Sequence, residues 1–379
     1  MDVVRKVMFS KRIENLNPYV PGEQPEGNFI KLNANENPYS PPREVVKELS
    51  KFTVQHAMDL ALYPDPESEE LREEIAKMLN VSNGFLHGKN ELPFTVTKDN
   101  IFCSNGSDEL LSFLFYAFFD SDKELILPEL TYSFYPVYAG FYSIPIKKIP
   151  LLQDWSLDTA TMLEEAKNST GMIFANPNAP TGIALTTQQL DEMIAKYPQD
   201  KIIVVDEAYV DFSKETAMPL LEKYKNLVIV RTFSKSFSLA GMRLGYCVAH
   251  TDLIDAIMKV KNSFNHFPVD ALTQKCGQLV CKKWKYFAET SQTIALTRDN
   301  FSTTLEQNGW DVIKSSTNFI MVRKQTGETG AEVYEAIKQH NYLVRYFDNP
   351  KTKDWVRISI GKPADMFKLA SIMCEKIFK

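Results

Sequence analysis

The sequence predicts an α/β protein with a large domain, built on a mostly parallel sheet between helices, and a smaller α+β domain. Short aliphatic runs without polar alternation, at 171–175, 201–205 and 227–230, are typical of strands that helices cover on both faces. The chain has 379 residues. A single hydrophobic core stops growing at roughly 250–300 residues, so two domains are expected.

The expected elements follow in order along the chain. Residues 1–40 are rich in Pro, Asn and Gly and predict an extended arm. Helical patterns lie at 41–56, 67–79, 108–119, 251–287, 331–338 and 363–378, and further strand-like runs at 124–127, 245–249, 310–313, 319–322, 342–345 and 355–360. The run at 245–249 is expected to be antiparallel, where the chain turns. We place the arm at 1–44, packed on the small domain, the large domain at 45–255 and the small domain at 256–379.

Composition argues against several functional classes. The net charge of −5 and the lack of a dense basic face argue against a nucleic-acid partner. The sequence shows neither the apolar core of a signal peptide nor a run near the roughly 20 apolar residues of a membrane span. Five scattered cysteines are typical of reduced thiols in the cytoplasm, and five histidines show no metal-ligand spacing. We therefore expect a cytoplasmic protein without a metal site, membrane contact or nucleic acid.

A Ser- and Thr-rich turn carries one lysine directly after a buried strand. It reads RTFSKSFSLAGMR over 231–243. Hydroxyl groups and a guanidinium are donors that hold a phosphate. This phrase closely resembles the signature with which fold-type I aminotransferases of classes I and II bind pyridoxal 5′-phosphate (PLP). The resemblance implies a fold-type I transferase in which Lys235 binds the cofactor covalently. It also implies that Ser234 and Arg243 hold the cofactor's phosphate, assisted by Thr232.

An acidic residue ends another buried run. The strand-like segment 201–205 leads into Asp206, and Tyr209 follows. A carboxylate at the end of a buried strand is costly without a cationic partner, although Asp206 also suits the cap of a following helix. A PLP enzyme needs a carboxylate opposite the pyridinium nitrogen, which preserves the ring as an electron sink. By the family's pattern, Asp206 is that partner and Tyr209 donates to the ring phenolate.

Two turns complete the expected cofactor site. The turn at 175–182 sets the backbone with Pro and Asn, and the resemblance implies that Asn178 donates its amide to the phenolate. The commoner form has asparagine where this chain has Ala179, a difference that affects the turn rather than Asn178. The second turn precedes a helix, whose N-terminus suits a phosphate; a capping box is the alternative there. By resemblance, the residues at the cofactor's phosphate are Gly106, Ser107 and Asp108.

Two tyrosines are assigned by the family pattern. Tyr132 matches the aromatic residue that stacks on the cofactor ring, although an aromatic in such a segment is more often part of the core. Tyr63, in the YPDP phrase, matches a residue that reaches the phosphate of a neighbouring subunit. The resemblance therefore implies a homodimer with shared active sites.

One arginine lies in the apolar C-terminal run 355–360. A buried guanidinium needs an anionic partner, and a structural ion pair is the alternative to a substrate. Phrases spread over nearly the whole chain resemble histidinol-phosphate aminotransferases: LNPYVPG at 16–22, LNANENP at 32–38, YPDP at 63–66, LVRYF at 343–347 and VRISIG at 356–361. The resemblance implies that the substrate's phosphate is bound by Tyr19, Arg345 and Arg357, and that Asn37 lines the pocket. More charge needs more donors, so two arginines suit a phosphate dianion.

The expected reaction is PLP-dependent transamination of L-histidinol phosphate with 2-oxoglutarate, which gives imidazole-acetol phosphate and glutamate in histidine biosynthesis. Its partners are a small-molecule amino donor and a 2-oxo acid. Aromatic amino-acid aminotransferases and threonine-phosphate decarboxylases share the scaffold and are the alternatives. A PLP-binding regulator would need residues for a DNA-binding domain, and a dinucleotide enzyme would need a GxGxxG motif, which the sequence lacks.

Overall fold

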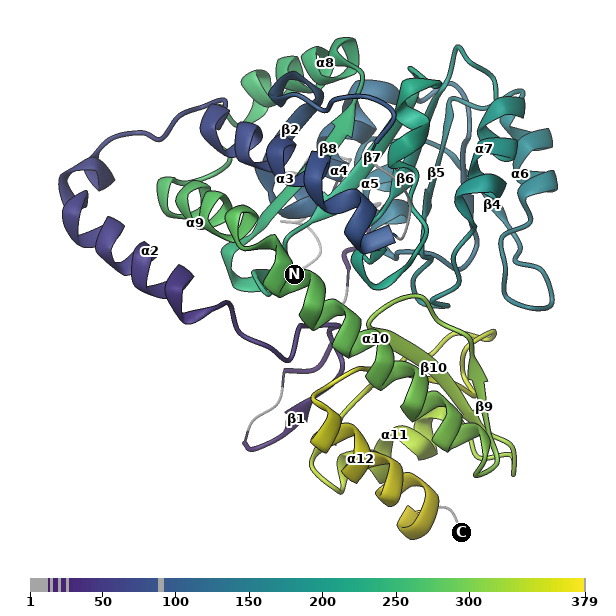
Figure 1. The fold of residues 1–379 in the computed structure, drawn as a ribbon. Coiled ribbons are helices and arrows are strands. Elements are labelled where there is room, and N and C mark those ends of the chain that lie inside the picture. The colour runs from purple at the N-terminus through teal and green to yellow at the C-terminus, as the bar shows by residue number, and fades with distance from the viewer. Residues whose placement is uncertain (1–12, 14–15, 20–21, 25–26, 88–91, 378–379) are drawn as a thin grey trace, which may run out of the picture.

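The structure is a computed structural model that describes residues 13, 16–19, 22–24, 27–87 and 92–377. A large unit holds a central sheet between helices, and a smaller unit with its own sheet lies below it in Figure 1. The long helix α10 (Trp284–Glu306) runs from the large unit into the small one. Among the described helices, none combines the length and apolarity that a membrane crossing requires.

The large unit is built on a seven-stranded sheet. In spatial order its strands are β2 (Ile101–Asn105), β8 (Leu244–Ala249), β7 (Leu227–Thr232), β6 (Ile202–Asp206), β5 (Gly171–Ala175), β3 (Leu125–Pro128) and β4 (Ile146–Ile149). From β7 to β4 the neighbours are parallel, whereas β8 is antiparallel to both β7 and β2. The expected mostly parallel sheet, with its antiparallel strand at 245–249, is therefore confirmed.

Both faces of this sheet are buried, which explains the uninterrupted aliphatic runs. In β5, Met172 and Phe174 join one core, and Ile173 between them joins the core of the opposite face. The flanking helices are α2 (Arg43–Gln55), α3 (Glu69–His87), α4 (Gly106–Phe118), α5 (Phe134–Phe141), α6 (Thr159–Ala166), α7 (Thr187–Lys196), α8 (Thr251–Phe264) and α9 (Ala271–Lys282). Side chains of α3, α6, α7 and α9 pack on the first face and those of α4, α5 and α8 on the second.

The small unit has an antiparallel four-stranded sheet, covered by α10, α11 (Gly330–Lys338) and α12 (Pro363–Ser371). Its spatial order is β12 (Arg345–Tyr346), β13 (Val356–Ser359), β10 (Phe319–Lys324) and β9 (Trp310–Ile313). In the described part of the N-terminal arm, β1 (Ile30–Lys31) pairs in parallel with β11 (Tyr342–Leu343). Leu32 joins the small unit's core, so this part of the arm packs on the small unit.

The expected boundary at residue 256 falls inside α8. Ile254 and Ile257 of α8 belong to the core of the large sheet, and Cys276 and Val280 of α9 belong to its other core. α10 contributes Phe287 to the large unit and Phe301 to the small one. The change from one unit to the other therefore occurs within α10.

Short helical turns connect these elements. The 3-10 helices are η2 (Ala57–Ala61), η3 (Lys98–Asn100), η4 (Val210–Phe212), η5 (Met218–Glu222) and η6 (Ala240–Met242), and η7 (Ile372–Ile377) is a π-helix.

A glycine in β8 allows that strand to pass beneath the start of α4. A Cβ atom at Gly245 would lie 2.4 Å from the backbone nitrogen of Ser107 and 2.6 Å from the carbonyl carbon of Gly106. We expect Gly245→Ala to lower the free energy of unfolding by about 1–3 kcal/mol, since backbone must move to relieve the overlap. Chemical denaturation measures this loss.

The matched control is Gly241→Ala in η6, where an added Cβ would meet no atom within 4 Å. We expect it to change the free energy of unfolding by no more than about 0.5 kcal/mol. Equal effects of the two substitutions would contradict the close contact of β8 with α4.

Candidate active site

Two cavities adjoin at the carboxyl ends of β5, β6 and β7. The outer cavity has a volume of about 500 Å³ and the inner one of about 190 Å³. β5 and β6 end in register, because Ala175 pairs with Asp206, and Asp206 pairs with Val230 near the end of β7. The residues that line both cavities are Ala34, Tyr132, Ala179, Tyr209 and Lys235. The lysine that the sequence singled out therefore lies where the two spaces meet.

The inner cavity brings together most of the residues expected to bind the cofactor. Those in its lining are Ser107, Asp108, Tyr132, Asp206, Tyr209, Thr232, Ser234, Lys235 and Arg243. They come from the start of α4, the loop before α5, the ends of β6 and β7 and the turn after β7. Gly106, Asn178 and Tyr63 are not in this lining.

Lys235 is held from two sides. Its ammonium nitrogen donates to the carbonyl oxygen of Ala34 at 3.2 Å and lies 5.7 Å from the centroid of the Tyr209 ring. The side-chain amide of Asn37 donates to the backbone carbonyl of Lys235 at 3.1 Å and to that of Ser236 at 3.0 Å. The arm thus fixes both the backbone and the head group of this lysine.

Asp206 faces the inner cavity with only 4% of its surface exposed. Burial raises the pKa of its carboxyl to about 6, while hydrogen bonds from Tyr135 and from the backbone of Ala208 lower it. The adjacent Glu207 is also buried, but it forms an ion pair with Arg231 at 2.7 Å. Asp206 is therefore the carboxylate suited to a cation inside the cavity.

An anion seat lies at the N-terminus of α4. The first amides of a helix lack partners within the helix and attract negative charge. Gly106 has a φ of +77°, and a Cβ there would lie 2.5 Å from a guanidinium nitrogen of Arg243, so only glycine lets this arginine approach. Arg243 also lies 3.5 Å from the hydroxyl of Ser234. Amides, a hydroxyl and a guanidinium therefore converge at one end of the cavity.

The carboxylate of Asp108 contacts two neighbouring side chains at this seat. One of its oxygens accepts the hydroxyl of Tyr132 at 2.9 Å, and the other pairs with Arg243 at 3.2 Å. Asp108 therefore offers the seat its backbone N–H, while its side chain fixes Tyr132 and Arg243.

Three expected site residues lie elsewhere. The amide of Asn178 donates to the carbonyl of Leu130 and to the hydroxyl of Thr181, within the turn after β5. Asn37 lines neither cavity and instead binds the lysine turn. Tyr63 is 82% exposed and stacks on Phe267, with 4.5 Å between ring centroids.

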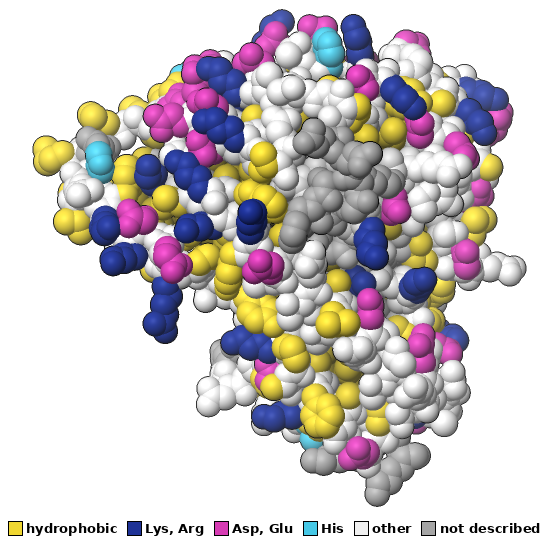
Figure 2. Space-filling view, in the orientation of Figure 1, with side chains coloured by type: hydrophobic (Ala, Val, Ile, Leu, Met, Phe, Trp, Pro, Cys, Tyr) yellow, Lys and Arg dark blue, Asp and Glu magenta, His cyan; other side chains and the backbone are white. Residues whose placement is uncertain are grey.

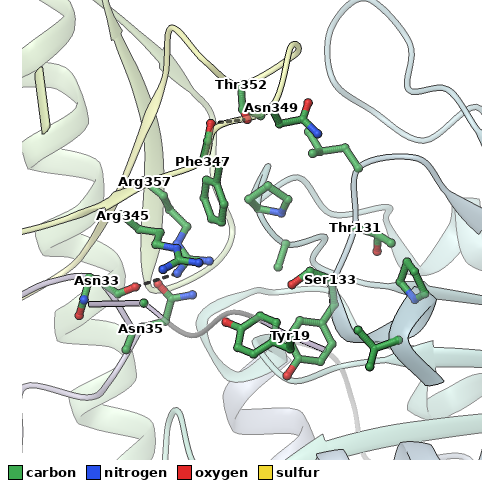
Figure 3. Close-up of a pocket in the computed structure, with 18 of the residues that line it drawn as sticks. Tyr19, Asn33, Asn35, Thr131, Ser133, Arg345, Phe347, Asn349, Thr352 and Arg357 are labelled. Carbon is green, nitrogen blue, oxygen red and sulfur yellow. Dashed lines mark hydrogen bonds between the residues drawn. The ribbon is translucent and has the colours of Figure 1, made fainter. Parts of the chain in front are cut away.

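The outer cavity contains two arginines of the small sheet. Figure 3 shows the guanidinium groups of Arg345 and Arg357 beside each other, with Tyr19 of the arm below them. The two arginines are directly opposite each other on β12 and β13. Both guanidiniums lie over the ring of Phe347, at 5.2 and 5.3 Å from its centroid. Like charges at opposite positions of a sheet repel each other, so this arrangement favours an anion between them.

Arg357 has unsatisfied hydrogen-bonding capacity within the described part of the chain. One terminal nitrogen donates to the carbonyl of Asn33 at 3.0 Å, but the buried Nε has no partner. Burial lowers the pKa of Arg357, and the charge of Arg345 lowers it further. A bound anion would satisfy the nitrogen and offset the repulsion.

Two residues around the site were not anticipated. Asn35 donates its amide to the hydroxyl of Tyr209 at 2.9 Å, and Tyr135 donates its hydroxyl to Asp206 at 2.8 Å. The dense asparagines of the phrase LNANENP were a signal for the first. Nothing in the sequence pointed to the second, because Tyr135 lies in α5, a helix that had not been predicted.

Comparison with known proteins agrees with this geometry. The model of the family "Aminotransferase class I and II" matches residues 27–372. The histidinol-phosphate aminotransferase of Syntrophus aciditrophicus (strain SB) is 46% identical over 372 residues, 97% of this chain and 98% of that protein. The one of Lactococcus lactis subsp. cremoris (strain MG1363) is 39% identical over 97% of both chains. The crystal structure of the Sinorhizobium meliloti histidinol-phosphate aminotransferase in complex with pyridoxal-5′-phosphate has a TM-score of 0.83 and 22% identity, and the match covers 98% of both chains.

The fold, the cavities and the family match define a PLP-dependent aminotransferase. The chain belongs to the class I and II aminotransferases and, among them, to the histidinol-phosphate aminotransferase family. The expected family, fold class and cofactor are confirmed. The residues present also fit PLP, because the inner cavity offers a lysine, a buried carboxylate and an anion seat.

The paired arginines predict that the holoenzyme binds inorganic phosphate in the outer cavity. We expect phosphate to raise the melting temperature, with a stabilisation of about 2.7 kcal/mol at 100 times its dissociation constant. Arg357→Met should lose this response, because it removes one of the two guanidiniums. A thermal shift titration of PLP-saturated protein measures both.

The matched control is Arg323→Met. Arg323 lies on β10 of the same sheet but pairs with Asp311 on β9, so its loss should leave the phosphate response unchanged. An equal response in wild type and Arg357→Met would contradict an anion site at this pair.

Proposed function

We propose that this chain transfers the amino group of L-histidinol phosphate to 2-oxoglutarate and thereby forms imidazole-acetol phosphate and glutamate, a step of histidine biosynthesis. The observation that carries the proposal is the pair Arg345 and Arg357, opposite each other in a cavity that also contains Lys235. A phosphate dianion matches two guanidiniums in charge and in donor geometry. The names of the relatives at 46% and 39% identity support the same substrate.

In this proposal the inner cavity holds the cofactor. Lys235 binds it covalently, and Asp206 faces its ring nitrogen. Tyr209 donates to the ring phenolate, and Tyr132 stacks on the ring. Asn178 would join Tyr209 at the phenolate by giving up one of its two present amide hydrogen bonds, to Leu130 or to Thr181. The phosphate is held by Gly106, Ser107 and Asp108 at the start of α4 and by Thr232, Ser234 and Arg243 around the lysine turn. The shared lining of the inner cavity supports nine of these assignments, while Asn178 and Gly106 are assigned by resemblance and neighbourhood.

The chain's own residues then perform the proton chemistry. When bound, PLP supplies an electron sink that weakens the bonds of the carbon bearing the substrate's amine. Asp206 keeps the ring nitrogen protonated, because an ionised carboxylate stabilises a cation beside it. Once released by the substrate's amine, the Nζ atom of Lys235 would take the proton from that carbon and return it on the other side of the amine nitrogen, which is a 1,3-shift. The position of Lys235 between the two cavities places this base beside both substrate and cofactor.

The small unit and the arm bind the substrate. The substrate's phosphate is bound at the far side of the outer cavity by Arg345, Arg357 and Tyr19. Asn37 does not contact the substrate in this proposal. Its amide donates to the backbone carbonyls of Lys235 and Ser236 and so positions the lysine turn. The same grip must also accept a carboxylate of 2-oxoglutarate in the second half of the reaction.

The proposed reaction is tested with purified holoenzyme. We expect Lys235→Ala to lose the visible absorbance of bound PLP and essentially all turnover, because both the covalent link and the base are removed. Lys225→Ala is the control, since Lys225 is exposed and precedes β7, the strand that leads to Lys235. Absorbance spectra and a coupled assay for glutamate formation measure these outcomes.

Three amino donors distinguish the proposal from its alternatives. kcat/KM should be higher for L-histidinol phosphate than for L-phenylalanine, and O-phospho-L-threonine should release no carbon dioxide. Preference for phenylalanine would indicate an aromatic amino-acid aminotransferase, and release of carbon dioxide a decarboxylase. Either result would contradict the proposed substrate.

We also propose that the chain works as a homodimer. The segment from α2 to the YPDP turn exposes large apolar side chains, which is uncommon for the surface of a monomer. These are Val46, Val54, Met58, Leu60, Leu62 and Tyr63. Figure 2 shows hydrophobic side chains at the left edge of the molecule, where α2 and the turn beyond it lie in Figure 1. In a dimer this surface would be covered, and Tyr63 would reach the partner's cofactor phosphate.

Charge reversal of the apolar surface tests the dimer. Val54→Glu/Leu62→Glu should shift the protein from dimer to monomer, because the interface would bury two unpaired carboxylates. Leu296→Glu is the control, since Leu296 is a similarly exposed side chain on α10. Sedimentation velocity measures the mass. A dimer that withstands the double substitution would contradict the proposed surface.

A cytoplasmic location also belongs to the proposal. All five cysteines are free thiols, and four of them are buried, as is typical of proteins kept in a reducing compartment.

A further inference from the structure

Tyr135 lies behind the wall of the inner cavity, next to Asp206. It is fully buried in α5 and lines neither cavity. Its hydroxyl donates to Oδ2 of Asp206 at 2.8 Å. Its ring meets that of Tyr132 edge to face, with 5.5 Å between centroids and 83° between planes. One side chain therefore contacts two residues of the cavity wall without entering the cavity.

The carboxylate of Asp206 is fixed by few contacts. Oδ1 accepts the backbone N–H of Ala208 at 3.0 Å, and Oδ2 accepts the hydroxyl of Tyr135. In the described part of the chain, no lysine or arginine forms an ion pair with Asp206, because the nearby Arg231 pairs with Glu207. The charged neighbours Asp108 and Glu207 both raise the pKa of Asp206. Tyr135 is thus one of two donors that stabilise its charged form.

In the hydrogen bond between Tyr135 and Asp206, the buried phenol is always the donor. Burial and the neighbouring Asp206 raise the pKa of Tyr135 well above its ordinary value. The phenol therefore keeps its proton and always donates it to the carboxylate. Phenylalanine at this position would keep the ring contact with Tyr132 but would leave a buried carboxylate oxygen without its donor.

We propose that Tyr135 is a positioning residue that fixes the carboxylate of Asp206 and the ring of Tyr132 in the wall of the inner cavity. It acts through these two residues and touches neither cofactor nor substrate. The inference rests on the proposed function only in that Asp206 faces the ring nitrogen of PLP. The hydrogen bond itself belongs to the protein without cofactor.

The first test uses cofactor-free protein. Infrared difference spectra between a protein and its Asp206→Asn derivative isolate the protonated-carboxyl band of Asp206, and a pH titration of that band gives the pKa. We expect a value of about 6 in the wild type and a rise of about one unit in Tyr135→Phe, since a hydrogen bond to a charged group is lost. The acidic limb of the kcat profile of the loaded enzyme should move to higher pH in the same direction.

The matched control is Tyr138→Phe. Tyr138 is a largely buried tyrosine one turn further along α5, packed on Phe134 and Phe115. None of the hydrogen bonds of Asp206 among the described residues involves it. The substitution should leave the pKa of Asp206 unchanged. An unchanged pKa in Tyr135→Phe, or equal shifts in both variants, would overturn the inference.

The second test uses holoenzyme loaded with PLP labelled with ¹⁵N at the ring. Near the pKa of Asp206, a smaller share of the ring nitrogen should be protonated in Tyr135→Phe than in wild type, because Asp206 is less often ionised there. In the Asp206→Asn background, Tyr135→Phe should have no further effect on this titration; a full effect there would overturn the inference. A shifted Asp206 pKa with an unshifted ring nitrogen would uphold the positioning by Tyr135 and overturn the role proposed for Asp206.

Discussion

Burial of charge at the ends of parallel strands is the constraint on which the rest of the site depends. β6 ends at Asp206 and is followed directly by Glu207, and both acidic residues are almost entirely buried. Two buried carboxylates side by side would be very costly if neither had a partner. Arg231, near the end of the neighbouring strand β7, forms an ion pair with Glu207. Glu207 also accepts hydrogen bonds from Thr216 and from the backbone of Ala217. Asp206 is left to face the cavity, with weaker internal support. Adjacent residues of the same chemistry are thereby given one structural and one functional environment.

The small unit also brings like charges together, but there they are positive. Antiparallel pairing of β12 with β13 puts Arg345 and Arg357 opposite each other, and no described carboxylate forms an ion pair with Arg357. Their repulsion is reduced by the ring of Phe347, over which both guanidiniums lie. The large unit thus presents a carboxylate that suits a cation, and the small unit presents cations that suit an anion. The buried carboxylate and the paired guanidiniums therefore belong to different units of the chain.

Much of this arrangement followed from the sequence, because buried parallel strands have a distinctive pattern. β5, β6 and β7 have no polar alternation, and the residues that follow them carry the family phrases. Other features depend on contacts that periodicity does not specify. The amphipathic patterns of α8 and α9 indicate helices, but they do not tell which sheet buries their apolar faces, so periodicity alone does not place the boundary between the two units. Tyr135 was missed because α5 is short and aromatic, without a clear helical stripe. Asn37 was expected in the pocket, since a motif does not reveal whether an amide binds a ligand or a backbone carbonyl.

The N-terminal arm connects the cavity residues of the large unit with those of the small unit. Its residues bond alternately to the two units: Asn35 contacts Tyr209 of the large unit and Ser359 of the small one. Asn33 accepts a hydrogen bond from Arg357, and Ala34 accepts one from Lys235. Lys235 and Arg357 are therefore tied to neighbouring peptide groups of a single extended segment. A rigid helix of the same length could not do this, because its carbonyls would be bonded internally. The Pro- and Asn-rich composition keeps the arm out of a helix. The backbone carbonyls of the arm therefore remain available as acceptors for Lys235 and Arg357.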